Sequence, residues 1–216
     1  AGNVVQATMR TYREAMKGLL PTPSKSHYTF NLRDFSRVVQ GVLLQEPSDQ
    51  FQNKPSVMRL WTHEALRVFG DRLTDDTDRQ WMCDHCSAMC KEVFKCDFQS
   101  EFDHIRPSDE TETGYGTLRR LFWGDYMTPA DEDERPYAEV PDLQQLQERT
   151  EEALSDFNSA SKKPMELVMF MFAIEHVSRI ARVLRMPGGN ALLVGVGGSG
   201  RQSLSILATE MAGYQL

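Results

Sequence analysis

Apolar residues up to about residue 105 recur at intervals of three and four, the spacing of one helical face. Four segments carry this pattern, and within each segment the polar residues fall on the opposite face of the helix. We therefore expect four helices: over residues 4–20, from Asn31 to no later than Pro47, over 56–69, and over about 75–94.

Helix-breaking and helix-capping residues bound these segments. Pro21 and Pro23 end the first helix, because proline lacks the N–H that a helix interior needs. Asn31, with Asp34 three residues later, has the composition of a helix N-cap. Residues 98–115 are mostly polar and contain proline and glycine, so we predict an interdomain linker at 106–116.

The second half of the chain has a mixed pattern. Residues 121–123 and 137–140 are short and strand-like, and they flank a solvated acidic turn of Asp131, Glu132, Asp133 and Glu134. A polar helix is predicted from Pro141 to about Ser159, and a more apolar helix from Pro164 to near Met186.

The run at residues 191–194 is apolar without alternation, which is typical of a buried central strand. From Ser203 onward, apolar residues at helical spacing predict a further helix.

Composition limits the function. The 216 residues include 24 Lys and Arg against 31 Asp and Glu, giving a net charge of -7 with scattered basic residues. This argues against a nucleic-acid partner. No apolar run approaches the roughly 18 residues of a membrane span, and no secretory signal precedes the first helix, so we expect a cytosolic protein without membrane contact. The missing initiator Met and the helical pattern at the end lead us to expect a piece of a longer protein.

A glycine-rich segment follows the strand-like run. Its spacing fits the phosphate-loop template of Gly, four free positions, and Gly-Lys-Ser/Thr, with a strand expected before it and a helix after it. Backbone N–H groups of such a loop surround an anion, and the following helix directs its positive end at the same phosphate. We therefore predict that ATP or ADP binds at Gly195, Val196, Gly197, Gly198, Ser199, Gly200, Arg201, Gln202 and Ser203.

Two positions depart from the template. Arg201 replaces the usual Lys, and Gln202 replaces the Ser or Thr whose hydroxyl binds Mg²⁺; a hydroxyl follows only at Ser203. We predict nucleotide binding with poor or absent hydrolysis and leave Mg²⁺ open. The alternative is a glycine turn that binds nothing.

Other residues have competing interpretations. Cys83, Cys86, Cys90 and Cys96, with His85 between them, suggest zinc, yet the first three share one helical face and favour buried thiols. The pair His63-Glu64 lacks the second His of a zinc-protease helix. We assign the apolar positions of the helix after Pro164 to the core: Met165, Val168, Met169, Phe172 and Ile174.

Three stretches carry a family resemblance. Residues 21–36 (PTPSKSHYTFNLRDFS) and 59–73 (RLWTHEALRVFGDRL) resemble the helical lid of a dynein heavy-chain AAA+ module. Residues 189–203 (GNALLVGVGGSGRQS) are similar to the degenerate phosphate loop of the fourth AAA+ module of axonemal dyneins. The three stretches occur in the expected order and frame nearly the whole chain.

The resemblance implies a mainly α fold with an incomplete α/β part. Residues 1–105 would be the lid of the third module, and 117–216 the start of the fourth module's large domain. It implies that Arg33 is the sensor-two arginine of the preceding module, which reaches the γ-phosphate of the nucleotide bound by that module. The alternative is that Arg33 pairs with Asp34 or another surface carboxylate. This piece alone would not hydrolyse ATP, because other required residues lie outside it.

For the complete protein, the resemblance implies microtubule-based movement by a ring of AAA+ modules. Its partners would be the other modules of the same heavy chain, the microtubule, and dynein intermediate and light chains, in the cytoplasmic cytoskeleton and the axoneme of cilia or flagella. The competing hypothesis is a structural helical adaptor with a vestigial loop. An independent P-loop kinase or transferase is a weaker option, because too little chain follows the loop.

Overall fold

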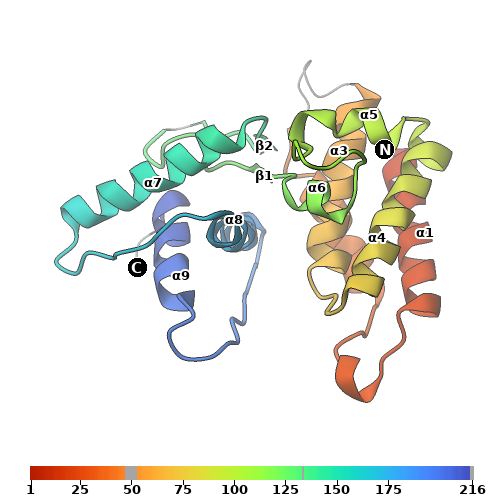
Figure 1. Cartoon of the computed structure of the whole chain (residues 1–216), viewed down its shortest axis with the longest axis horizontal. Helices are drawn as coiled ribbons and strands as arrows, with labels where there is room; N and C mark the ends of the chain where they lie inside the picture. Colours follow the sequence, from red (N-terminus) through yellow and green to blue (C-terminus); the bar gives the residue numbers. More distant parts are fainter. Residues whose placement is uncertain (47–52, 133, 215–216) are drawn as a thin grey trace. The chain divides into compact units, whose positions relative to one another are not determined.

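The computed structural model describes residues 1–46, 53–132 and 134–214, in two compact units (Figure 1). The first unit is Ala1–Leu121 and the second is Phe122–Leu216. Pro47 and Asp133, which bear on the end of the second helix and on the acidic turn, lie outside the described residues.

The first unit is built from helices. Four main helices match the four predicted from periodicity, and the third and fourth each continue into one π-helical turn. They are α1 (Gly2–Gly18), α2 (Leu32–Val42), α3 (Lys54–Ala65, then Leu66–Gly70) and α4 (Asp76–Met89, then Cys90–Phe94). Shorter pieces are Pro23–Lys25, α5 (Phe98–Glu101), Asp103–Ile105 and α6 (Tyr115–Arg119).

The predicted cap of α2 is confirmed. The Asn31 side chain accepts a hydrogen bond from the backbone N–H of Arg33 (2.8 Å), and Asp34 accepts one from the backbone N–H of Asn31 (2.9 Å). These contacts satisfy N–H groups that have no partner inside the helix. The capping residues therefore set where α2 begins.

The buried face of α1 differs from the prediction. Two of its apolar residues, Val5 and Met16, are 47% and 42% exposed. The buried stripe instead contains small residues, among them Ala7 and Thr8. Small side chains allow close approach of a neighbouring helix, and the Trp61 indole donates a hydrogen bond to the Thr8 hydroxyl (3.0 Å).

The segment 106–116, predicted as a linker, lies within the first unit. Arg106 donates to the Gln99 carbonyl (2.7 Å), the Thr113 backbone donates to the Gln99 side chain (2.7 Å), and the Thr117 hydroxyl donates to Glu110 (2.7 Å). The polar residues are thus tied to nearby helix ends, and the division between units falls after Leu121.

The second unit combines one small sheet with three helices in its described part. The strands β1 (Trp123–Gly124) and β2 (Ala138–Glu139) pair antiparallel, which confirms the two strand-like pieces. The helices are α7 (Leu143–Ala160), α8 (Met171–Arg185) and α9 (Arg201–Met211). Both α7 and α8 pack against α9 (Figure 1).

The helix predicted from Pro164 begins only at Met171, although it ends where expected. Before it, buried and exposed residues alternate over 165–170, the pattern of an extended chain. Asn158 holds this segment through two hydrogen bonds with the Met165 backbone (2.7 and 2.9 Å). Val168 and Phe172 are 80% and 53% exposed, so their assignment to the core was wrong.

The predicted buried strand at 191–194 is also absent from the described structure. Leu192 and Val194 are 89% and 83% exposed, and these residues form neither helix nor strand. A strand needs a hydrogen-bonded neighbour, and the described part of the chain places none beside this run. The apolar run therefore forms no strand there.

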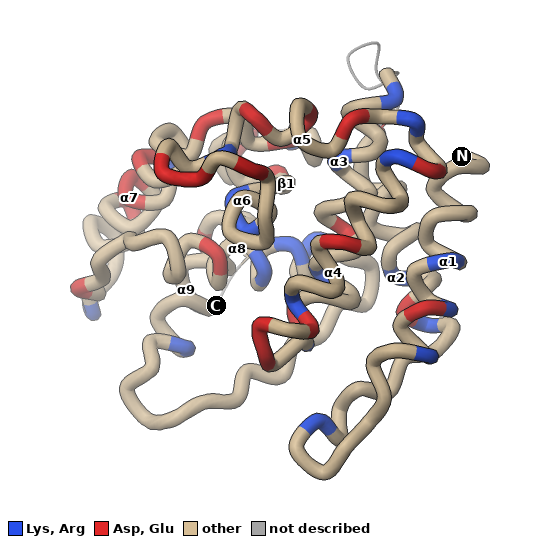
Figure 2. The backbone as a smooth tube through the Cα atoms, turned by 45° about the vertical axis from the view of Figure 1, so that its right-hand side comes forward, with Lys and Arg blue, Asp and Glu red and all other residues tan. Residues whose placement is uncertain are grey.

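Charge is distributed in keeping with exposed helix surfaces. Acidic residues line α7 and the loop before it (Figure 2). The described residues of the acidic turn, Asp131, Glu132 and Glu134, are exposed. No helix in the described ranges is both long and apolar enough to cross a membrane.

Candidate functional site: the glycine loop before α9

Glycines shape the turn that leads into α9. Gly198 and Gly200 have φ angles of 77° and 76°, in the left-handed region that L side chains rarely adopt. A Cβ on Gly195 would lie 3.2 Å from the Ser199 hydroxyl oxygen and 3.4 Å from Arg201 Cδ. The template glycines are therefore required by backbone angle or by close approach, and the nine predicted site residues form one continuous turn and helix start.

The N-terminus of α9 presents backbone N–H groups. The first helical hydrogen bond after the cap runs from the Leu204 N–H to the Gly200 carbonyl (2.9 Å). The N–H groups of Arg201, Gln202 and Ser203 precede it and have no acceptor within the helix. Such donors, with the positive end of the helix dipole, favour an anion.

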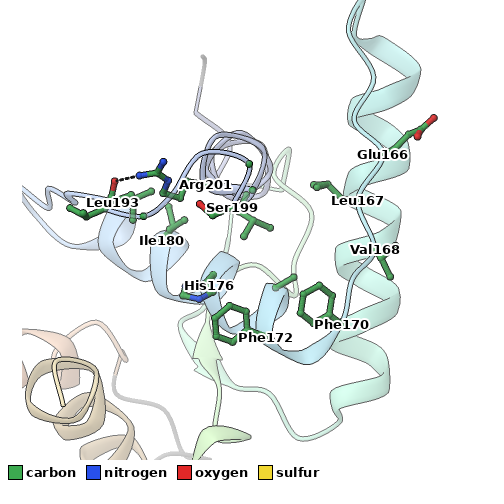
Figure 3. A pocket seen from close by; sticks show the side chains of 16 residues that line it. Glu166, Leu167, Val168, Phe170, Phe172, His176, Ile180, Leu193, Ser199 and Arg201 are labelled. Carbon is green, nitrogen blue, oxygen red and sulfur yellow. Dashed lines mark hydrogen bonds between the residues drawn. The ribbon is translucent and has the colours of Figure 1, made fainter. Parts of the chain in front are cut away.

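Arg201 lies half-buried in the first turn of α9. Its Nη1 donates to the Leu193 carbonyl (3.3 Å) and its Nη2 to the Val196 carbonyl (3.1 Å). Figure 3 shows the guanidinium turned toward Leu193. A fixed positive charge therefore lies within the loop, at the position where the template has Lys.

A cavity of about 570 Å³ adjoins the loop (Figure 3). One wall is the loop, and the other is largely apolar and aromatic. Phe170 and Phe172 stack with ring centroids 6.4 Å apart, and His176 meets Phe172 edge-on at 4.3 Å. Residues 165–170 are apolar apart from Glu166, so their pattern fitted a helical face and did not predict this wall.

The chain's own donors fit phosphate better than Mg²⁺. A second cavity of about 1050 Å³ on the loop is lined by Gln202, Ser203 and Ser205, which offer neutral oxygens. Mg²⁺ sites in proteins use one or two carboxylates. Glu166 supplies a carboxylate to the first cavity, and the lining of the second contains none. Figure 3 shows Glu166 pointing away from Ser199 and Arg201.

Arg33 lies in the first turn of α2 with an exposed side chain. Asp34, its alternative partner, instead accepts a hydrogen bond from Arg72 (2.8 Å). Among the described residues, the Arg33 guanidinium forms no ion pair with Asp34 or with another carboxylate. Arg33 belongs to the first unit and the glycine loop to the second.

The cysteines of α4 are buried thiols, as their spacing on one face indicated. Cys83, Cys86 and Cys90 are at most 3% exposed, and the Cys90 thiol contacts Met58 Sδ at 3.0 Å. Burial raises the pKa of Cys83 to about 12, so the thiol keeps its proton, whereas zinc binds the thiolate. In the described ranges, no cluster of three or more His, Cys, Asp or Glu has a metal-binding arrangement.

Fold and site together define a class: a helical unit followed by a unit in which a glycine-rich loop leads into a helix. Residues 1–79 match the dynein heavy chain ATPase lid domain, and residues 165–216 match the P-loop containing dynein motor region D4. The chain belongs to the dynein heavy-chain family, and its relatives are of the axonemal type.

Three relatives illustrate the similarity. The chain is 49% identical over 214 residues to dynein axonemal heavy chain 12 of Mus musculus, covering 99% of this chain and 7% of that relative. It is 49% identical over 213 residues to dynein axonemal heavy chain 3 of Homo sapiens (99% and 5%). It is 41% identical over 212 residues to dynein axonemal heavy chain 1 of Mus musculus (98% and 5%). The chain thus spans a small fraction of these relatives.

Proposed function

We propose that this chain binds ATP or ADP at the glycine loop and joins two neighbouring AAA+ modules of an axonemal dynein motor. The observation that carries the proposal is the set of N–H groups at the start of α9 beside the Arg201 guanidinium. Both features stabilise a polyphosphate, since one supplies directed hydrogen bonds and the other a permanent positive charge.

The cavity beside the loop supports a nucleotide over a simple anion. With its phosphates on the N–H groups of α9, a nucleotide would extend its base toward Phe170 and Phe172 across the cavity (Figure 3). Flat aromatic rings and apolar side chains suit a purine, because they bury its faces without requiring particular donors. The chain's own residues would bind and orient the ligand, and no step of hydrolysis is assigned to them.

Coupling between modules follows from the position of the loop after a lid-type unit. A bound nucleotide stabilises the folded loop by mass action, because an unfolded chain does not bring its N–H groups together. In this proposal the bound nucleotide stiffens the start of the large domain that follows the lid-type unit. Strain from hydrolysis at other sites then passes through a stiff joint between the modules. Arg33 would act as the sensor-two residue of the preceding module.

In the complete protein we propose microtubule-based movement in the axoneme of cilia or flagella, within the cytoskeleton. The other AAA+ modules, the microtubule, and the intermediate and light chains would be its partners. The names of the relatives support this cellular setting. Arg33→Ala in the complete motor should lower ATP turnover; unchanged turnover would remove the sensor role.

Calorimetry tests nucleotide binding directly. ADP titrated into the chain should give saturable heat, and Arg201→Ala should weaken affinity by roughly 10- to 150-fold, as expected when a charged hydrogen-bond partner is lost. Arg13→Ala, an exposed position on α1, is the matched control. Absence of heat with ADP and with ATP would favour the structural adaptor.

A further inference from the structure

Arg201 connects three parts of the second unit through one side chain. It starts on the first turn of α9, and its guanidinium donates to the carbonyls of Leu193 and Val196. Leu193 belongs to the unpaired apolar run, whereas Val196 lies within the loop. The contacts therefore join the run, the loop and the helix.

The stem of Arg201 lies against the glycine that opens the loop. A Cβ on Gly195 would be 3.4 Å from Arg201 Cδ and 3.5 Å from its Nε. Figure 3 shows the guanidinium turned toward Leu193 and away from Phe170 and Phe172. The arginine stem thus packs beside Gly195 as it reaches back over the loop.

Phosphate and these carbonyls compete for the same nitrogens. A guanidinium holds phosphate most strongly through two parallel N–H groups, and the carbonyls engage both Nη1 and Nη2 of Arg201. Carbonyl oxygens carry partial negative charge, so phosphate oxygens placed beside them on the same fork would be repelled. Binding one partner in bidentate fashion therefore disfavours the other.

We propose that Arg201 is a positioning residue that exchanges the Leu193 and Val196 carbonyls for a nucleotide's phosphate and so links nucleotide binding to the conformation of residues 193–196. The Leu193 carbonyl then loses its guanidinium donor. Phosphate binding thereby affects the apolar run through one hydrogen bond, the one between Arg201 and the Leu193 carbonyl. This inference rests on the proposed nucleotide binding.

Isotope labelling isolates the Leu193 carbonyl. The chain contains Leu followed by Val only at 167–168 and 193–194. With carbonyl-¹³C leucine and ¹⁵N valine, a carbonyl–amide correlation spectrum should contain two cross-peaks. Val194→Ala removes one of them and so assigns the Leu193 carbonyl.

Without added nucleotide, Arg201→Ala should move the Leu193 carbonyl resonance upfield, because the carbonyl loses its guanidinium donor. Titrating ADP into the unsubstituted chain should move this resonance in the same direction, in step with the calorimetric saturation. Arg13→Ala should leave it in place. Arg201→Lys should give an intermediate position, since one ammonium replaces the fork.

Different failures have different meanings. An identical Leu193 resonance in the unsubstituted and Arg201→Ala chains overturns the carbonyl contact. Calorimetric binding of ADP with an unmoved resonance overturns the exchange and leaves the proposed function standing. Absence of heat with ADP overturns both the proposed function and the exchange. In that case the Leu193 resonance of the unsubstituted and Arg201→Ala chains still tests whether Arg201 contacts the Leu193 carbonyl.

Discussion

The helical core of the first unit and the glycine-loop region of the second differ in how deeply their apolar residues are buried. In the first unit, Leu60 and Trp61 are fully buried, and the Trp61 indole also has a hydrogen-bond acceptor. In the second unit, Leu192 and Val194 lie 89% and 83% exposed beside the glycine loop, although other residues form a buried core around α8 and α9. Leucine thus lies in the core at position 60 and on the surface at position 192.

This contrast indicates which contacts stabilise the first unit and where the proposed binding would occur in the second. Buried apolar contacts hold the helices of the first unit, whereas the loop conformation in the second depends on glycine backbone angles and on one arginine. Ligand-binding segments commonly come from the less stable parts of a protein, because they must rearrange on binding. Substitutions in the two units should therefore have different consequences.

The largest expected effect comes from truncating one leucine in each unit. Leu60→Ala should lower the free energy of unfolding by about 2 to 5 kcal/mol, because it leaves a cavity in a closed core. Leu192→Ala should change it by no more than about 0.5 kcal/mol. Urea unfolding measures both; equal effects would contradict the contrast between the units.

A smaller effect is expected from Gly195→Ala. The added methyl group would lie 3.2 Å from the Ser199 hydroxyl oxygen, which must shift by a few tenths of an ångström. Such crowding costs about 1 to 3 kcal/mol, so ADP affinity should fall roughly 5- to 150-fold by calorimetry. Gly2→Ala, where no atom lies within 4 Å, is the control. Unchanged affinity in Gly195→Ala would mean that the loop tolerates the crowding.

Removing the cap of α2 should cost about 1 kcal/mol. Asn31→Ala leaves the Arg33 N–H without its side-chain acceptor. Urea unfolding should show the loss, and Asn31→Asp should restore most of it. Asn3→Ala on the exposed side of α1 serves as control. A loss as large as that of Leu60→Ala would show that the cap does more than start the helix.

The smallest effect is a pH dependence centred on His85. Burial lowers the pKa of His85, Arg10 lowers it further, and Glu14 and Glu92 oppose the shift. Because the unfolded chain binds the proton more readily, this contribution to stability is present above pH about 6.5 and is lost as the pH falls toward the folded-state pKa.

Thermal unfolding between pH 5 and about 7.5 measures this dependence. His85→Gln should flatten the curve in this range while keeping a hydrogen-bonding group near Thr11, which lies 3.0 Å from the His85 ring nitrogen. An equally steep curve in the variant would assign the dependence to other groups.

Local signals predicted the helices well. The Asn31–Asp34 pair marked the start of α2, and the helical spacing of Cys83, Cys86 and Cys90 indicated their burial. Predictions failed where the pattern fitted two structures. Met165 and Val168 matched a helical face, but residues 165–170 form neither helix nor strand, and Asn158 on the preceding helix makes two hydrogen bonds with the Met165 backbone. Nothing local in the sequence reveals that contact, because its partner lies on another helix.

The sequence by itself determined the positions of the main helices, the glycine turn and the family, because caps, periodicity and loop spacing act over a few neighbouring residues. Only the tertiary structure decided that the polar segment 106–116 belongs to the first unit, that Phe170 and Phe172 face the loop across a cavity, and that Arg201 turns back to Leu193. Those outcomes depend on which distant groups meet, since burial and hydrogen bonding are settled by packing rather than by local preference.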